Sequence, residues 1–93
     1  MRYVRTTTNH LVAVTRYGGI YRMKIDAETF GQIKKEGTKW SAEARRTETG
    51  EIVRFGGIWN TLRDAVDELF SFTDEGREAY RAHRANVRRE LGI

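Results

Sequence analysis

Residues 39–69, KWSAEARRTETGEIVRFGGIWNTLRDAVDEL, decide the fold of this 93-residue chain. From Trp40 to Arg45 apolar and polar residues alternate, as in a strand with one buried face. A TETG turn at 47–50 leads to a partner strand at 51–55. The pair Gly56-Gly57 then interrupts the pattern, and we expect the chain to turn back across the sheet at that point.

A capped amphipathic helix follows at Thr61–Phe70. Thr61 and Asp64 stand three residues apart in a variant of the capping box, which satisfies otherwise unpaired amides. A second helix is expected to open at Thr73 and to run to about Leu91. The apolar stripe of the first helix consists of Ile58, Leu62, Ala65, Val66 and Leu69.

The N-terminal part of the chain adds a hairpin and a third helix. Strand-like runs at 10–16 and 20–25 flank the turn Gly18-Gly19. The first residues, MRYVRTTT, either extend the first strand or form an arm. From Asp26 to Gly37 a capping aspartate, apolar residues at spacing three and a terminal glycine predict a short helix. The expected fold is α+β, with a small antiparallel sheet in the order β-β-α-β-β-α-α and the helices packed on one face.

Composition limits the class of protein. At 93 residues we expect one domain over residues 1–93. The chain has neither cysteine nor proline, so it can form no disulfide or thiolate metal site. No stretch approaches the roughly 18 apolar residues of a membrane span, and the N-terminal residues lack the apolar run of a signal peptide. We therefore expect a cytoplasmic protein with no membrane partner. Lys and Arg number 17 against 13 Asp and Glu, and the resulting net charge of +4 is compatible with a nucleic-acid partner.

Basic side chains gather on one face of the predicted sheet. If the helices cover the apolar face, period-two alternation leaves the cations on the open one. Only Glu43 opposes them there, so such a face would neutralise several phosphates. An ordinary solvated sheet face would carry the same residues, and we weigh the two interpretations equally. The predicted cations of this face are Arg22, Lys24, Arg45 and Arg54.

A ridge of arginines runs along the last helix. At 100° per residue its members fall in a sector about 60° wide, where they would track phosphates or grip an acidic protein surface. A solvated helix face is the plainer interpretation, since charge runs usually serve solubility and cations near a helix C-terminus favour its dipole. The ridge consists of Arg77, Arg81, Arg84 and Arg88, with Tyr80 beside it.

The residue pattern contains no recognisable catalytic site. His10 and His83 lie in different elements and match no metal-ligand spacing. The two glycine pairs belong to no phosphate-binding pattern, so no cofactor and no enzyme activity are expected. Trp40 and Trp59 are expected in the core, and an exposed Trp59 would become a candidate contact residue.

Part of the 39–69 stretch resembles the AP2-type DNA-binding domain and the arm-type DNA-binding domain of tyrosine integrases. The resemblance is carried by an opening aromatic, an Ala-Glu-x-Arg run, and a Gly, aromatic, Thr and Ala near the helix start. Here these residues are Trp40, Ala42, Glu43, Arg45, Gly57, Trp59, Thr61 and Ala65. Those families place a three-stranded sheet in the DNA major groove and brace it with a helix. The resemblance therefore implies that Arg45 and Arg54 contact DNA, while Trp40 and Ala65 belong to the structure.

Two functions follow as expectations. The first is a small DNA-binding accessory protein that uses the basic sheet face and the arginine ridge, with DNA expected rather than RNA. The second is a non-enzymatic protein-interaction module of the phage or plasmid type, which binds the acidic surface of a host protein and inhibits that protein. Its contact residues would be Tyr80, Arg81, Arg84 and Trp59. Both expectations leave a homodimer open.

Overall fold

The computed structural model describes the backbone of residues 1–92 and the side chains of residues 1–85 and 92. Six strands come first and two helices follow them. The chain is therefore α+β with an antiparallel sheet, but its helices are not interleaved with strands as the sequence predicted. The elements are β1 (Arg2–Arg5), β2 (Leu11–Tyr17), β3 (Ile20–Lys24), β4 (Thr29–Glu36), β5 (Lys39–Arg46), β6 (Ile52–Trp59), α1 (Leu62–Phe70) and α2 (Asp74–Leu91).

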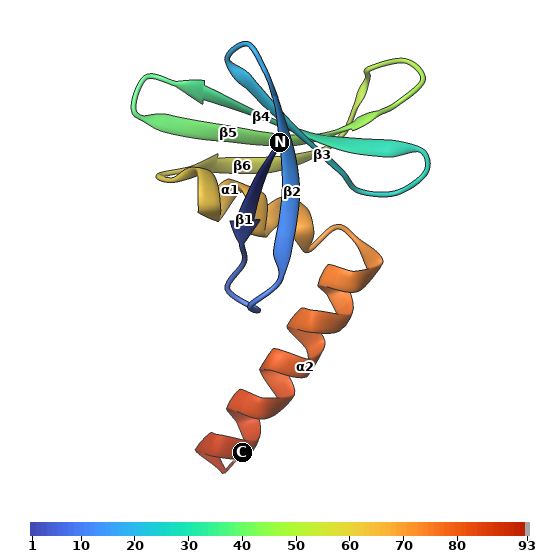
Figure 1. Cartoon of the computed structure of the whole chain (residues 1–93). Helices are drawn as coiled ribbons and strands as arrows, with labels where there is room; N and C mark the ends of the chain where they lie inside the picture. The colour runs from blue at the N-terminus through green and yellow to red at the C-terminus, as the bar shows by residue number, and fades with distance from the viewer. Residues whose placement is uncertain (93) are drawn as a thin grey trace.

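The sheet is a simple meander in which each strand pairs antiparallel with the next, in the order β1 to β6. The predicted hairpin around Gly18-Gly19 is confirmed as β2 and β3. The first residues neither extend the first predicted strand nor form an arm: they make a separate strand, β1, which pairs antiparallel with β2. In Figure 1 the β1–β2 hairpin points down beside α1, whereas the remaining strands spread above it.

Helix α1 covers one face of the sheet and closes the core. It contacts β1, β4, β5 and β6, and its apolar stripe is buried. We call this side of the sheet the covered face and the other side the open face. The residues of the core are Val4, Val12, Val14, Met23, Ile33, Ala42, Ala44, Leu62, Ala65, Val66, Leu69, Phe70 and Phe72.

The predicted cap of α1 is confirmed, and one member of its predicted stripe is not. The Thr61 hydroxyl accepts a hydrogen bond from the Asp64 amide at 3.1 Å, so the helix begins where the capping pattern placed it. Ile58 is 62% exposed and lies on the open face, because it belongs to β6 rather than to the helix.

The helix predicted over Asp26–Gly37 is wrong, because these residues form a turn and β4. The Asp26 carboxylate accepts from the amides of Glu28 and Thr29, both at 2.8 Å, so it caps a turn instead of a helix. Gly31 is a buried strand residue. A Cβ there would stand 2.7 Å from Leu69 Cδ1, so any side chain at this position would force the packing against α1 to shift.

Strand β6 does not end at Gly56-Gly57, as the sequence predicted, but continues to Trp59. Its register against β5 shifts twice, between Ala42 and Glu43 and between Ala44 and Arg45. Each shift is a β-bulge, which places an extra residue on one strand and reverses the side to which the following residues point. Gly57 supplies the positive φ of 94° that one of these irregularities needs.

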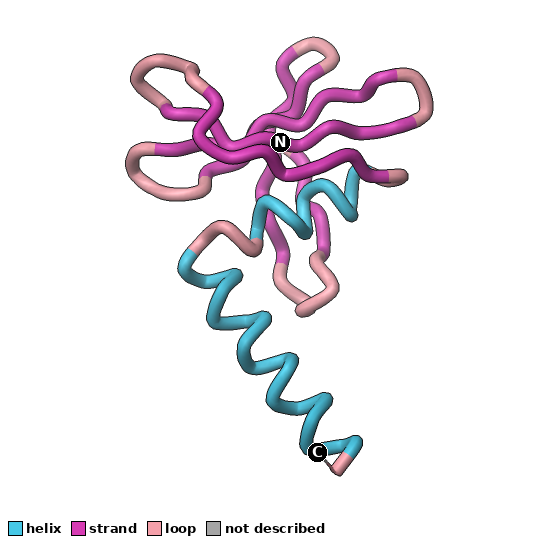
Figure 2. Tube along the Cα trace, turned by 180° about the vertical axis from the view of Figure 1, so that it is seen from behind, coloured by secondary structure: helices cyan, strands magenta, loops and turns pink. Residues whose placement is uncertain are grey.

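Helix α2 joins α1 at a tight corner and then projects away from the sheet (Figure 2). The Thr73 hydroxyl accepts from the Gly76 amide at 2.8 Å, which confirms the predicted start of this helix. A Cβ on Gly76 would lie 1.7 Å from the Phe70 carbonyl oxygen, so only glycine permits this corner. The predicted packing of all helices on the sheet therefore holds for α1 alone. Within residues 1–92 no helix is long and apolar enough to cross a membrane.

Candidate nucleic-acid interface

Three rows of side chains cross the open face, because residues that pair across antiparallel strands point to the same side. We name each row by its residue on β3. On β2, Thr15 extends the Arg22 row and Tyr17 extends the Ile20 row. From β3 to β6 the Lys24 row consists of Lys24, Phe30, Arg45 and Ile52. The Arg22 row consists of Arg22, Gln32, Glu43 and Phe55. The Ile20 row consists of Ile20, Lys34, Ser41 and Ile58.

Each row carries one exposed cation on β3 or β4. Arg22 and Lys24 point to the open face as predicted, and Lys34 joins them from β4. Among residues 1–85 none of the three forms an ion pair, so their charge faces the solvent uncompensated. We call these three residues the basic stripe.

Aromatic rings hold the central cation in place. The Arg22 guanidinium carbon lies 5.4 Å from the centroid of the Tyr17 ring and 5.0 Å from that of Phe30. Cation–π attraction at such distances orients a guanidinium without consuming its hydrogen-bond donors. Arg22 is therefore positioned and still able to bind an anion.

Glu43, the acid within the three rows, is neutralised by its neighbours. Arg45 Nη2 stands 2.7 Å from Glu43 Oε1, and Gln32 Nε2 donates to the same oxygen at 3.2 Å. Arg45 Nη1 also donates to the Gly50 carbonyl oxygen at 2.7 Å. Arg45 thus lies on the predicted face, but its guanidinium is already occupied by the protein itself.

The placement of Arg54 on the open face was wrong. Its partner across the strands is the buried Ala44, and its guanidinium carbon lies 3.9 Å from the centroid of the buried Phe72 ring. The register shifts of β6 cause this reversal, since strict alternation from Ile52 would have turned Arg54 and Phe55 the other way. Arg45 and Arg54, which the family resemblance pairs as DNA contacts, lie on opposite faces of the sheet.

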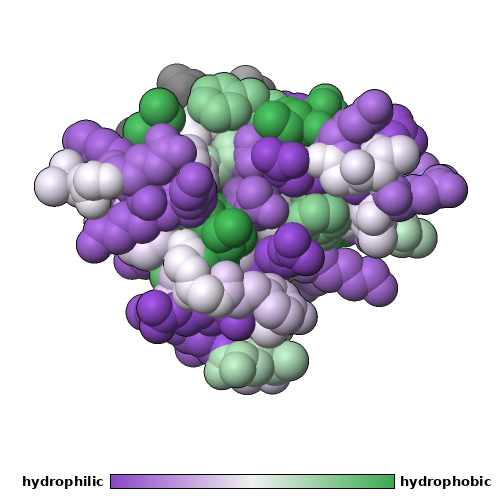
Figure 3. Space-filling view, turned by 90° about the horizontal axis from the view of Figure 1, so that it is seen from above, coloured by the Kyte–Doolittle hydropathy of each residue, from purple (hydrophilic) through white to green (hydrophobic). Residues whose placement is uncertain are grey.

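Large apolar side chains take the place of Arg54 on β6. Each of the three rows ends on β6 in a large apolar residue, namely Ile52, Phe55 or Ile58. Ile52 is 53% exposed, and Phe55 and Ile58 are each 62% exposed. We call these three residues the apolar stripe. The sequence does not indicate this stripe, because the bulges that turn Phe55 outward leave no local signal beyond the glycine pair. From above, apolar side chains form separate groups among hydrophilic ones (Figure 3).

The arginine ridge of α2 lies apart from the open face, since the helix points away from the strands (Figure 1). Arg77 pairs with Asp74, and Arg81 Nη1 lies 2.8 Å from Glu78 Oε1, so two of its charges are partly balanced. Arg84 is exposed. The side chain of Arg88 lies outside the described residues. The structure therefore does not join the ridge and the sheet cations into one surface.

The two aromatic residues proposed as protein contacts are held by the fold. Burial raises the pKa of the Tyr80 hydroxyl, which donates to the Asp67 carbonyl oxygen at 3.4 Å. Trp59 Nε1 donates to the Gly56 carbonyl oxygen at 2.7 Å, and the ring packs against the core as predicted. Neither aromatic ring projects freely into the solvent.

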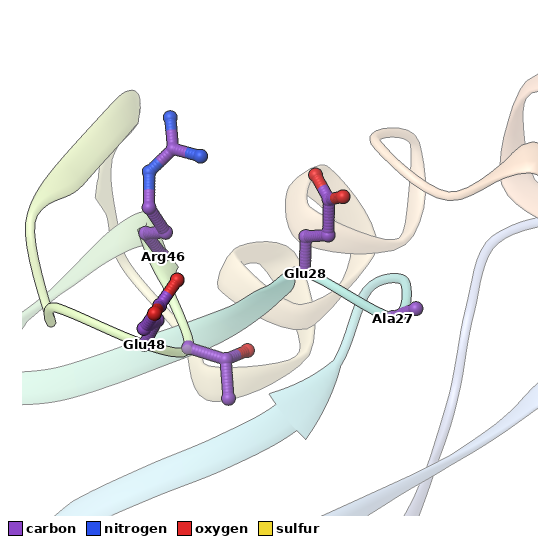
Figure 4. A pocket seen from close by; sticks show the side chains of 5 residues that line it. Ala27, Glu28, Arg46 and Glu48 are labelled. Atoms are coloured by element: carbon purple, nitrogen blue, oxygen red, sulfur yellow. The ribbon is translucent and has the colours of Figure 1, made fainter.

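One shallow cavity of about 300 Å³ lies beside the β3–β4 and β5–β6 turns (Figure 4). Side chains of mixed charge line it, with Glu28 and Glu48 set against Arg46. Within the described part of the chain, no three acidic or histidine side chains converge as metal ligands.

The open face thus combines a basic stripe, an apolar stripe and a neutralised acid on one side of the sheet. Its residues come from five consecutive strands, and the sequence anticipated Arg22, Lys24, Glu43 and Arg45 among them. No protein-family model, curated protein or solved structure matches this chain.

Proposed function

We propose that this protein is a small nucleic-acid-binding accessory protein, with DNA as the expected ligand, and that its open face forms the interface. The basic stripe carries the proposal: Arg22, Lys24 and Lys34 lie on adjacent strands without ion-pair partners among residues 1–85. Phosphates are the ligands that such a row of cations neutralises most favourably, because each contact releases condensed counterions. The net charge of +4 acts in the same direction by steering a polyanion toward the protein.

A fluorescence-anisotropy titration tests this function. The probe is a short labelled DNA of mixed sequence, presented as a single strand and as a duplex at about 50 mM and about 200 mM salt. We expect micromolar or tighter affinity at the lower salt, weakening steeply at the higher. Absence of binding to both forms at low salt would contradict the proposal.

A matched pair of double variants locates the interface. Arg22→Gln with Lys24→Gln removes two charges from the open face. Lys35→Gln with Arg46→Gln removes two from β4 and β5, where both side chains are exposed and their strand partners, Trp40 and Thr29, are not on the open rows. Both pairs lower the net charge equally, so only a local effect separates them. For single-stranded DNA we expect the slope of log affinity against log salt concentration to fall in magnitude by about 1.4 in the Arg22→Gln, Lys24→Gln variant. Equal losses of affinity in the two double variants would assign the binding to net charge alone.

A protein-binding function has one supporting observation. The side chains of residues 81–85 are all exposed on the projecting part of α2, where Arg81 and Arg84 present guanidinium groups to an acidic partner. A partner captured from nuclease-treated lysate, and lost with Arg81→Glu and Arg84→Glu, would support this alternative. Loss of capture on nuclease treatment would contradict it.

A further inference from the structure

The apolar stripe of β6 is not explained by phosphate binding. Ile52, Phe55 and Ile58 are each more than half exposed and aligned along one strand at the edge of the sheet. They contribute nothing to the core beneath α1, which lies on the other face. A sheet edge usually carries charged residues that discourage association, so this row requires a partner surface of its own.

We infer that the open face binds single-stranded nucleic acid in preference to duplex, with the phosphates on the basic stripe and the bases on the apolar stripe. This inference rests on the proposed function. The apolar stripe on β6 lies three strand spacings from Arg22 and Lys24 on β3, about 14 Å, and two from Lys34 on β4, about 10 Å. A single strand presents charged phosphates on one side and unpaired bases on the other, which matches this division.

Base stacking supplies the chemistry of the second stripe. Aromatic side chains hold unpaired bases through their π-faces, and such contacts tolerate any sequence because every base has one. Phe55 lies at the centre of the apolar stripe with 62% of its surface exposed. Phe30 and Tyr17 add rings beside the basic stripe, where they already flank the Arg22 guanidinium.

A duplex fits the same face poorly. Its bases are stacked inside and its outer surface carries phosphates on both strands, so the apolar stripe would desolvate charged groups without reaching a base face. Groove recognition by a sheet also needs polar side chains that reach base edges. The arginine expected for that role on β6, Arg54, stacks on Phe72 across the sheet instead.

The experiment compares single-stranded DNA, single-stranded RNA of the same sequence and the DNA duplex, each by anisotropy with the full chain. We expect at least one single strand to bind ten or more times more tightly than the duplex, by the stacking contacts that pairing hides. The RNA and DNA arms identify which polymer is preferred, and a preference for either supports the inference. Equal or tighter duplex binding overturns it while leaving the proposed function intact. Failure of all three probes overturns both.

Variants at the stripe separate stacking from folding. Phe55→Ala should weaken single-strand binding about fivefold or more, whereas Phe55→Trp should retain it. Leu11→Ala is the matched control, because Leu11 is 58% exposed but lies at the far end of β2, beside β1. Circular dichroism confirms that each variant is folded. Unchanged affinity with Phe55→Ala, accompanied by a change of oligomeric state in size-exclusion chromatography, would assign the stripe to a protein contact and overturn the inference.

Discussion

The two faces of the sheet are built from alternate residues of the same strands and have opposite properties. On β4, Ile33 is fully buried against α1, while its neighbours Gln32 and Lys34 point to the open face. The covered face holds the apolar contacts that stabilise the fold. The open face has no such task, so its cations and exposed apolar residues are available for binding. Stability and the proposed function can therefore be altered separately, one face at a time.

The largest effect should come from truncating the centre of the covered face. Leu69 is fully buried in α1, so Leu69→Ala should lower the free energy of unfolding by about 2–5 kcal/mol. Ile58→Ala, on the open face at 62% exposure, should change it by less than about 0.5 kcal/mol. Urea denaturation followed by circular dichroism measures both. Similar losses in the two variants would show that the open face also contributes to the core.

A methyl group added to the covered face should destabilise the protein by overpacking. In Gly31→Ala the new Cβ meets Leu69 Cδ1 at 2.7 Å and Met23 Cγ at 2.9 Å, so we expect a loss of about 1–3 kcal/mol. Gly19→Ala is the control, because no atom lies within 4 Å of its Cβ.

A double-mutant cycle tests the contact between Gly31 and Leu69 directly. Combined with Leu69→Ala, the methyl group of Gly31→Ala enters the space that the leucine leaves, so its cost should fall below that in the parent protein. Additive free energies in the denaturation series would contradict the direct contact between β4 and α1.

The smallest expected effect on stability is the pH-dependent contribution of Asp26, in the turn that leads into β4. Hydrogen bonds from Thr29 and Glu28 hold the pKa of the Asp26 carboxyl below its ordinary value. A lowered folded pKa adds stability that is present above the unfolded pKa and is lost as pH falls through the folded one. We therefore expect this contribution to disappear on acidification below the ordinary aspartate range. NMR titration of the carboxyl carbon measures the pKa, and Asp26→Asn should remove this part of the acid dependence; an unshifted carboxyl would contradict the turn geometry.

Local signals predicted much of the architecture but misjudged residues 26–37. The glycine turn of β2–β3, the alternation of β5 and the Thr61 cap each specify an element within a few residues, and all three are confirmed. The helix predicted for residues 26–37 is wrong because an aspartate cap opens a turn as readily as a helix. Their alternate residues also fit a strand, and that pattern would have placed Phe30 and Lys34 on one face.

The candidate site was predicted less completely than the fold. Arg22, Lys24 and Arg45 lie on the open face as expected, because each follows the alternation of its own strand. Arg54 and Phe55 exchange faces, since the bulges between β5 and β6 depend on how two strands align rather than on either sequence alone. That exchange replaced an expected cation with an exposed ring, on which our proposal of single-strand binding rests.

The basic character of the chain, its main hairpins and the start of both helices follow from the amino-acid sequence, because these features depend on residues close together along the chain. The folded structure alone shows that residues 29–36 pair as a strand, that Gly31 lies against Leu69, and that α2 leaves the sheet at Gly76. It also decided which side chains of β6 meet the solvent. Strand pairing and helix packing join residues far apart in sequence, so local preferences yield wherever burial of the shared core outweighs them.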